Sequence, residues 1–192
     1  MNLLVTGGAG FIGSMFIERI VESRSIVPVD EVIILDKITY ASYPNHLSVW
    51  ENDSRIRFVK GDITDRSLIQ KLIPSVNAVI NFAAESHVDN SIANSSPFFH
   101  SNIIGTTTLL EEIKKSPSTI RFLQVSTDEV YGSLKNHEAS ESDFLNPSSP
   151  YAASKASADL AALSFFKTYG CDVVIGRSVN NYGPRQHQEK LI

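Results

Sequence analysis

The chain has little cysteine and no long apolar run. Cys171 is the single cysteine among 192 residues, so the chain cannot close an internal disulfide framework. No apolar stretch approaches the length needed to cross a bilayer, and the N-terminus lacks the basic start and the cleavage site of a secretory signal. These absences argue against a membrane role and favour a cytoplasmic protein.

The sequence also lacks a basic cluster. Its net charge of -4 is spread over the whole chain, which argues against electrostatic binding to nucleic acid. Hydrophobic residues make up 42% and charged residues 20%, a composition typical of a globular domain with a sizeable core. We therefore expect small molecules as ligands, and we predict no metal site.

Short apolar runs alternate with longer segments of helical period. This alternation predicts βα units that build an α/β fold with a doubly wound parallel sheet. We expect strands at residues 2–6, 31–36, 55–60, 78–83, 120–126 and 172–177. We expect helices at about 11–23, 65–73, 98–115 and 151–169, with Asp65 and Ser96-Pro97 as start signals and Gly170 as a stop.

A glycine-rich turn, Gly7 to Gly13, follows the first expected strand. Gly8, Gly10 and Gly13 match the spacing G-x-G-x-x-G, which lets a backbone approach a pyrophosphate at a helix N-terminus. The pattern alone is weak, since a plain tight turn also explains it. Its place between a strand and a helix strengthens it, and Asp36 ends the next strand 23 residues after Gly13. A carboxylate there accepts the ribose hydroxyls of NAD and repels the 2′-phosphate of NADP, so the pattern favours NAD.

Two neighbouring segments leave alternatives open. Lys37 keeps NADP as a minority option, although a solvated lysine is the simpler explanation. Asp62 and Ile63 follow the third expected strand and would lie near the adenine, but Gly-Asp after a strand is also common turn chemistry.

Tyr151 and Lys155 form a Y-x-x-x-K pair on the last expected helix. The spacing places both side chains on one helix face, where an ammonium can lower the tyrosine pKa from near 10 and let the phenolate act as a base. A solvated lysine and a half-buried tyrosine would explain the same pattern. The dinucleotide pattern upstream favours the catalytic interpretation.

Asp128 and Glu129 follow Ser126-Thr127 at the end of the fifth expected strand. A loop there lies at the carboxyl edge of the sheet, where ligands bind in this architecture. Exposed loop acids are usually only solvated. An elimination needs both an acid and a base, so we interpret the pair as catalytic groups directed at the cofactor crevice.

Five segments resemble the dTDP-glucose 4,6-dehydratases, within the extended short-chain dehydrogenase/reductase family. They are residues 6–14, 35–40, 83–89, 126–132 with 151–155, and 180–184. The tripeptide Thr-Asp-Glu is specific to the dehydratase branch. The resemblance spans nearly the whole chain and implies a Rossmann-type domain that binds NAD, followed by a smaller lobe that binds the nucleotide sugar.

The resemblance also implies two sets of ligand contacts. In addition to the glycine loop, the implied NAD contacts are Phe11, Ile12, Asp36, Lys37, Ile38, Thr39, Asp62, Ile63, Phe82, Ala83, Ala84, Glu85, Ser86, Ser101, Tyr151, Lys155 and Asn181. The implied contacts to the dTDP-glucose substrate are Ser86, Thr127, Asn180, Lys190 and Leu191. The implied domains are residues 1–180, which bind NAD, and residues 181–192, which begin a truncated sugar lobe.

A reaction sequence follows from the same resemblance. Tyr151 takes the proton of the sugar 4-hydroxyl while C4 gives hydride to NAD, and Thr127 bonds the same oxygen. Glu129 then removes the C5 proton and Asp128 protonates the departing C6 hydroxyl. Return of the hydride to C6 gives dTDP-4-keto-6-deoxyglucose and regenerates the cofactor.

Two alternatives and one assembly remain open. A nucleotide-sugar 4-epimerase or decarboxylase would share the glycine loop, Asp36, Tyr151 and Lys155, but does not require the acid pair. An NAD-binding module without turnover is a second alternative, because the sugar lobe is missing. By analogy, the helices at 98–115 and 151–169 would form a homodimer face, although core packing within one chain would explain the same apolar residues.

Overall fold

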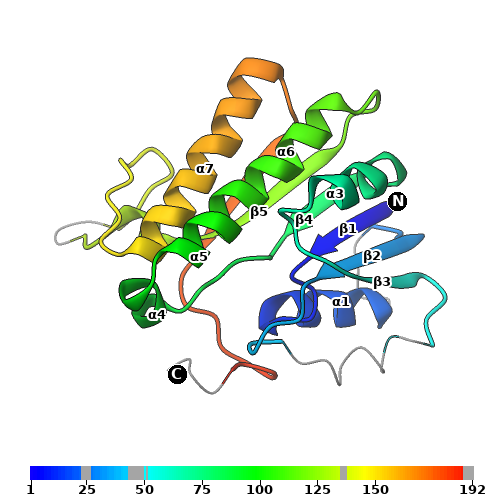
Figure 1. The fold of residues 1–192 in the computed structure, drawn as a ribbon, viewed down its shortest axis with the longest axis horizontal. Helices are drawn as coiled ribbons and strands as arrows, with labels where there is room; N and C mark the ends of the chain where they lie inside the picture. The colour runs from blue at the N-terminus through cyan, green and yellow to red at the C-terminus, as the bar shows by residue number, and fades with distance from the viewer. Residues whose placement is uncertain (23–26, 43–49, 51, 135–137, 188–192) are drawn as a thin grey trace.

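The computed structural model describes residues 1–22, 27–42, 50, 52–134 and 138–187. Within this part of the chain, six parallel strands form one sheet in the order β3-β2-β1-β4-β5-β6 (Figure 1). The strands are β1 (Asn2–Thr6), β2 (Glu31–Asp36), β3 (Ile56–Lys60), β4 (Ala78–Asn81), β5 (Arg121–Thr127) and β6 (Val173–Ser178). The predicted α/β fold with a doubly wound parallel sheet is confirmed.

One strand ends earlier than predicted. β4 stops at Asn81, whereas the sequence suggested residue 83. The backbone N-H of Phe82 still donates to the carbonyl of Thr6 at 3.1 Å, but that of Ala83 donates to the Thr6 hydroxyl at 3.3 Å. A side chain thus replaces the neighbouring strand as acceptor, and the chain leaves the sheet.

Helices cover both faces of the sheet. The principal helices are α1 (Phe11–Val21), α3 (Arg66–Leu72), α6 (Thr106–Lys115) and α7 (Pro150–Tyr169). Shorter helical segments are η2 (Ile73–Ser75), α4 (Val88–Ala93), α5 (Ser96–Phe98), η3 (Phe99–Gly105) and η4 (Asp128–Tyr131). No helix in the described ranges is both long and apolar enough to cross a membrane.

Two short helical segments were not predicted, and one predicted helix is divided. α4 and η4 were missed because each is too short to show a helical period. The helix expected at 98–115 is divided into α5, the π-helical η3 and α6. The apolar period of the sequence continues through these three segments, so it predicted one helix. The pattern of backbone hydrogen bonds, however, changes at two points along that helix.

Two hydrophobic clusters hold the layers together. Successive side chains of β1 and β2 point to opposite faces, so their continuous apolar runs are buried on both sides. On one face, Leu4, Ile33 and Leu35 pack with Leu109, Leu110, Ala162 and Phe165 of α6 and α7. On the other face, Leu3, Val5, Val32 and Ile34 pack with Ile17 and Ile20 of α1. Figure 1 shows α6 and α7 side by side above the sheet and α1 below it.

The order of the strands reverses at β1. β1 pairs with β2 on one side and with β4 on the other. The connections that follow β1 and β4 therefore lead toward opposite edges of the sheet. In open parallel sheets this switch point is where ligands bind. The glycine-rich turn follows β1 directly, so it lies at the switch point.

The sequence places Tyr151 accurately because α7 has strong end signals. The Ser149 side chain caps the helix by accepting from the N-H of Ala152 at 3.1 Å, and Pro150 occupies the first turn. Gly170, with φ 71°, ends the helix in the left-handed conformation. Tyr151 therefore lies in the first turn of α7, with Lys155 one turn further along.

We expect Gly7→Ala to destabilise the fold more than Gly170→Ala. Both glycines have positive φ, 67° and 71°, but a Cβ at position 7 would lie 2.6 Å from the backbone nitrogen of Ala83, whereas nothing lies within 4 Å at position 170. The conformational cost common to both is about 1–2 kcal/mol, and the backbone clash adds roughly 1–3 kcal/mol. Urea denaturation measures both free energies of unfolding. Equal losses would contradict this account of the glycine loop.

Candidate active site

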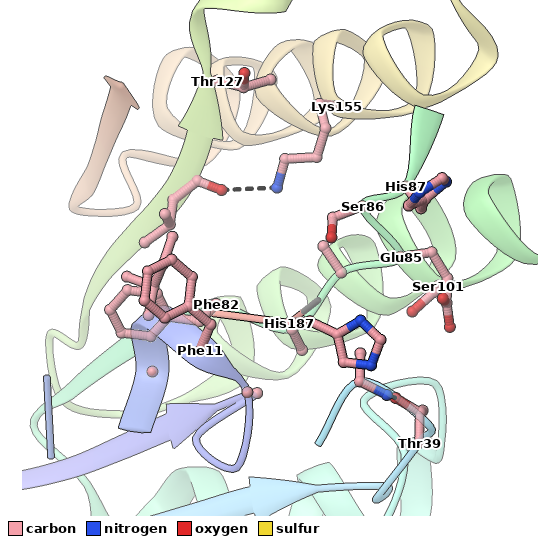
Figure 2. A pocket seen from close by; sticks show the side chains of 18 of the residues that line it. Phe11, Thr39, Phe82, Glu85, Ser86, His87, Ser101, Thr127, Lys155 and His187 are labelled. Atoms are coloured by element: carbon pink, nitrogen blue, oxygen red, sulfur yellow. Dashed lines mark hydrogen bonds between the residues drawn. The ribbon is translucent and has the colours of Figure 1, made fainter. Parts of the chain in front are cut away.

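A cavity of about 500 Å³ lies at the switch point. Its wall combines the glycine-rich turn, the carboxyl ends of β2 and β5, the segment after β4, the start of α7 and the segment after β6. In Figure 2, Lys155 extends toward this cavity from α7, and Phe11, Phe82, Ser86 and His187 lie around it. Segments far apart in the sequence therefore share one recess.

Most of the predicted site residues line this cavity. They are Gly7, Gly10, Phe11, Ile12, Gly13, Asp36, Lys37, Thr39, Asp62, Ile63, Phe82, Ala83, Ala84, Glu85, Ser86, Ser101, Thr127, Glu129, Tyr151, Lys155, Asn180 and Asn181. Gly8, Ile38 and Asp128 are described but are not part of the lining. Lys190 and Leu191 lie outside the described residues.

Two of the residues outside the lining act through packing or backbone geometry. A Cβ on Gly8 would meet the side chains of Ile34 and Ile17 at 2.6 and 2.7 Å, so this glycine lets α1 approach the sheet. Ile38 has φ 58°, and its N-H donates to Oδ1 of Asp36 at 2.8 Å. Both shape the turns that border the cavity.

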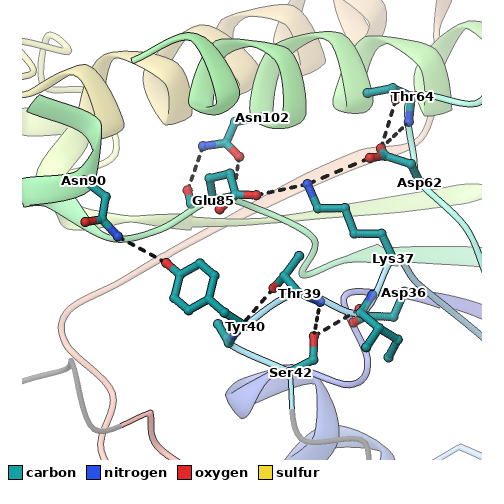
Figure 3. Close-up of polar contacts among 12 residues, drawn as sticks. Asp36, Lys37, Thr39, Tyr40, Ser42, Asp62, Thr64, Glu85, Asn90 and Asn102 are labelled. Carbon is teal, nitrogen blue, oxygen red and sulfur yellow. Dashed lines mark hydrogen bonds and ion pairs between the residues drawn. The ribbon is translucent and has the colours of Figure 1, made fainter. Parts of the chain in front are cut away.

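Asp36 is a buried carboxylate at the end of β2. Its Oδ2 accepts from the N-H of Ala9 at 2.9 Å, and its Oδ1 accepts from the N-H of Ile38. Oδ1 also accepts from the Ser42 hydroxyl at 3.3 Å (Figure 3). These bonds hold the carboxylate against the glycine-rich turn. Because Asp36 also lines the cavity, its position matches that of a ribose acceptor.

Lys37 is paired with two carboxylates. Its Nζ lies 3.0 Å from Oε1 of Glu85 and 3.8 Å from Oδ2 of Asp62 (Figure 3). These contacts replace the solvated lysine considered from the sequence. An ammonium shared by two carboxylates is a poor partner for a further phosphate, which weakens the case for NADP.

Tyr151 is buried beside the acids that follow β5. Burial and then the charge of Glu129 raise its pKa above the ordinary value, while a hydrogen bond with Thr127 lowers it. Its backbone N-H donates to the Ser91 hydroxyl at 3.1 Å, which ties the start of α7 to α4. Without a nearby cation, this phenol stays protonated at neutral pH.

The ammonium of Lys155 is bonded to the backbone of β5 in this structure. Its Nζ donates to the carbonyl of Val125 at 2.7 Å, the bond drawn in Figure 2. Burial lowers the pKa of Lys155 to about 8, and the charge of Asp159 opposes that effect. The ammonium therefore lies in the cavity wall with one hydrogen bond to the strand that carries Thr127.

Thr127 organises the acid pair. Its hydroxyl accepts from the N-H of Glu129 at 3.3 Å and donates to Oδ1 of Asp128 at 3.2 Å. Glu129 lines the cavity, whereas Asp128 does not, although its charge also raises the pKa of Tyr151. Tyr151, Lys155, Thr127 and Glu129 therefore meet in one cavity, with Asp128 at its border.

The sequence did not indicate the role of Asn102. This buried residue lies in the π-helical η3, and its Oδ1 accepts from the N-H of Glu85 at 2.8 Å. Its Nδ2 donates to the Glu85 carbonyl at 2.9 Å and to the Ser154 hydroxyl at 2.8 Å. One side chain thus fastens the segment after β4 to α7. π-helical turns are common at functional sites, but nothing in the sequence pattern marked this one.

Several other residues of the cavity wall were not predicted from the sequence. Val125, Ser126 and Ser178 could have been found, since they end strands at the carboxyl edge. His187 had no signal, because only the fold brings it next to Tyr40, with ring centroids 5.7 Å apart.

The fold and the cavity together define a Rossmann-type dinucleotide-binding domain of the short-chain dehydrogenase/reductase class. The strand order, the glycine-rich turn and the Tyr151/Lys155 pair all belong to that class. The sequence model of the family described as GDP-mannose 4,6 dehydratase matches residues 4–192. The chain belongs to this family.

Several named relatives are similar over the whole chain. The low-salt glycan biosynthesis protein Agl12 of Haloferax volcanii is 46% identical over 192 residues, covering 100% of this chain and 60% of that protein. The dTDP-glucose 4,6-dehydratase of Mycobacterium tuberculosis is 46% identical over 195 residues, covering 100% of this chain and 57% of that protein. The resemblance to dTDP-glucose 4,6-dehydratases found in the sequence is confirmed.

Solved structures agree with this relationship. The dTDP-glucose 4,6-dehydratase DesIV of Streptomyces venezuelae, solved with NAD bound, matches with a TM-score of 0.96 and 52% identity, over 100% of this chain and 60% of that one. A UDP-glucuronic acid 4-epimerase of Bacillus cereus, also solved with NAD, has a TM-score of 0.86 and 30% identity, over 97% and 59% of the two chains. The chain therefore spans about three fifths of the length of its relatives.

Proposed function

We propose that this chain carries the cofactor domain and the catalytic side chains of an NAD-dependent dTDP-glucose 4,6-dehydratase, a hydro-lyase. The observation that carries the proposal is the convergence of Tyr151, Lys155, Thr127 and Glu129 on the cavity at the switch point. The higher identity to dehydratases than to the epimerase, 52% against 30%, supports the same choice.

The residues at the switch point fit a dinucleotide. A Cβ at Gly13 would lie 2.3 Å from the Gly7 carbonyl oxygen, so glycine there lets the start of α1, where a pyrophosphate would bind, pack closely against the turn. Asp36 would accept from a ribose. When bound, NAD supplies the hydride chemistry, accepting hydride from the sugar and returning it.

In the proposed oxidation, Tyr151 removes the proton of the sugar 4-hydroxyl and Thr127 bonds the same oxygen. The pKa of Tyr151 is raised by burial and by Glu129, so its phenolate requires a cation. Lys155 is the ammonium that lines the same cavity. We assign it this role, together with a hydrogen bond to a ribose of the cofactor.

In the proposed elimination, Glu129 removes the proton at C5, which the adjacent carbonyl makes acidic. Asp128 protonates the departing C6 hydroxyl. The position of Glu129 in the cavity wall supports its role directly, while Asp128 is supported by its bond to Thr127 at the border of the cavity. An epimerase or decarboxylase would not require these two acids.

The function is tested by incubating the protein with NAD and dTDP-glucose. A product that has lost one water and forms the chromophore of a 4-keto-6-deoxy sugar in alkali supports the dehydratase. A product changed only in its C4 configuration, or decarboxylation of a uronic acid substrate, supports the sibling enzymes. Binding of NAD without any product supports a cofactor module, and absence of NAD binding would overturn the proposal.

We expect Glu129→Gln to lower the dehydration rate by about 10²–10⁴-fold, because a neutral amide cannot take the C5 proton. Incorporation of solvent deuterium at C5 should be lost in the same variant. Glu141→Gln, an exposed acid in the segment before α7, is the matched control and should behave as the wild type. Unchanged dehydration by Glu129→Gln would refute this assignment.

We expect the wild type to bind NAD more tightly than NADP and Asp36→Ser to reduce that preference, because the carboxylate that repels a 2′-phosphate is gone. Lys37→Ala is the paired variant. If Glu85 and Asp62 hold the Lys37 ammonium, that ammonium does not bind the 2′-phosphate, so Lys37→Ala should leave the affinity for NADP unchanged. Calorimetric titration with both cofactors measures these affinities. A large loss of NADP affinity in Lys37→Ala would instead assign Lys37 to the phosphate.

We also propose a homodimer formed by the face that η3 and α7 present. Its exposed apolar side chains include Ile104 of η3 and Leu160 of α7. We expect Leu160→Glu to convert the dimer to a monomer in sedimentation velocity, because it places a charge in an apolar contact. Phe144→Ser removes an exposed aromatic from the segment before α7 and should leave the dimer intact. A wild-type monomer at all concentrations would exclude this assembly.

A further inference from the structure

A buried carboxylate lies directly behind the site. Asp159 is completely buried on α7, one helical turn beyond Lys155. Its Oδ2 accepts from the Ser126 hydroxyl at 3.0 Å and from Nε of Arg177 at 2.8 Å. Its Oδ1 is buried with no hydrogen-bond partner among the described residues. None of the steps proposed above uses this group.

Arg177 extends the connection from Asp159 to the acid-bearing segment. It lies on β6, and its Nη1 donates to the hydroxyl of Tyr131 at 2.7 Å. The guanidinium also lies over the Tyr131 ring, 5.0 Å from its centroid. Tyr131 is the last residue of η4, the segment that begins with Asp128 and Glu129. A single carboxylate thus connects α7, β5, β6 and η4.

We propose that Asp159 is a positioning residue of this site, holding Lys155 as an ammonium inside the protein and fixing η4 against α7. The assignment rests on the proposed function for its catalytic consequence, but its electrostatic part can be measured without substrate. Burying an ion pair is costly, and a buried pair is weak support for stability. A charge in this place is therefore better explained by what it does to the groups around it.

The charges around Asp159 explain why it is needed. Burial lowers the pKa of Lys155 to about 8, and Asp159 is the charge that opposes this fall. Burial raises the pKa of Asp159 itself, while Arg177, Ser126 and Lys155 act against that rise. The other titratable groups of this region are on α7 and η4, namely Tyr151, Asp128, Glu129 and Tyr131. Arg177 thus forms an ion pair with this buried carboxylate, and Lys155 lies one helical turn away on the same helix.

The sign of the expected effect follows from these charges. Removing the charge of Asp159 leaves Lys155 with only the effect of burial, so its pKa falls further below that of the wild type. A larger fraction of Lys155 is then neutral at pH 7 to 8. If the reaction needs the ammonium, its rate declines as pH rises through the pKa of Lys155, so the alkaline limb of the rate profile moves to lower pH.

The experiment compares the wild type with four variants by NMR titration of isotope-labelled lysine side chains in the presence of NAD and by the pH profile of dehydration. Lys155→Arg identifies the Lys155 signal. We expect Asp159→Asn to lower the pKa of Lys155 by about one unit or more and to move the alkaline limb equally. Asp159→Glu, which retains the charge, should restore both toward the wild type. Ser126→Ala removes one hydrogen bond but no charge and is the matched control.

A further variant keeps the test decisive if Asp159→Asn does not fold. Arg177→Gln removes the cation that holds down the pKa of Asp159, so Asp159 loses its charge more readily and the pKa of Lys155 should fall, as in Asp159→Asn. A Lys155 pKa unchanged in every folded variant would overturn the proposal, as would equal shifts in Asp159→Asn and Ser126→Ala. If the wild type binds NAD but forms no product while the Lys155 pKa shifts as expected, the proposed function fails and the electrostatic role of Asp159 stands.

Discussion

The close approach of two backbones at the carboxyl end of β1 is the constraint on which the site depends. Gly7 turns the chain away from β1 in a left-handed conformation, directly against the backbone of Ala83 as it leaves β4. Because no side chain separates these segments, the glycine-rich turn and the segment from Phe82 to Ser86 border the same cavity. Asp36 and Asn102 then hold the flanks, each through bonds to backbone groups.

On this frame, the chemistry is governed by burial more than by single contacts. The phenol of Tyr151 and the ammonium of Lys155 are both withdrawn from water, and burial disfavours the charged form of each. A site of this kind works only if other charges are placed to counteract burial. Asp159 provides such a charge for Lys155, whereas Glu129, Asp128 and Asp159 all add to the effect of burial on Tyr151. The reactivity of the pair is a property of the whole region.

Much of this arrangement was visible in the sequence. The apolar runs of β1 and β2, the glycine spacing and the caps of α7 each depend on neighbours in the chain, so their effects could be predicted locally. Where the prediction was wrong, a distant partner intervened. β4 ended early, at the point where the Thr6 hydroxyl accepts from the N-H of Ala83. Likewise, no local pattern predicted the hydrogen bond from Lys155 to the Val125 carbonyl.

The sequence by itself determined which groups would gather at the carboxyl edge of the sheet, because the type and the ends of each element follow from local patterns. Only the tertiary structure decided their protonation and their partners. Lys37 between two carboxylates, Asn102 across η3 and α7, and Asp159 beneath Lys155 all depend on contacts between residues far apart in the chain or on burial. Burial and long-range pairing depend on the whole folded molecule, so no local sequence pattern can predict them.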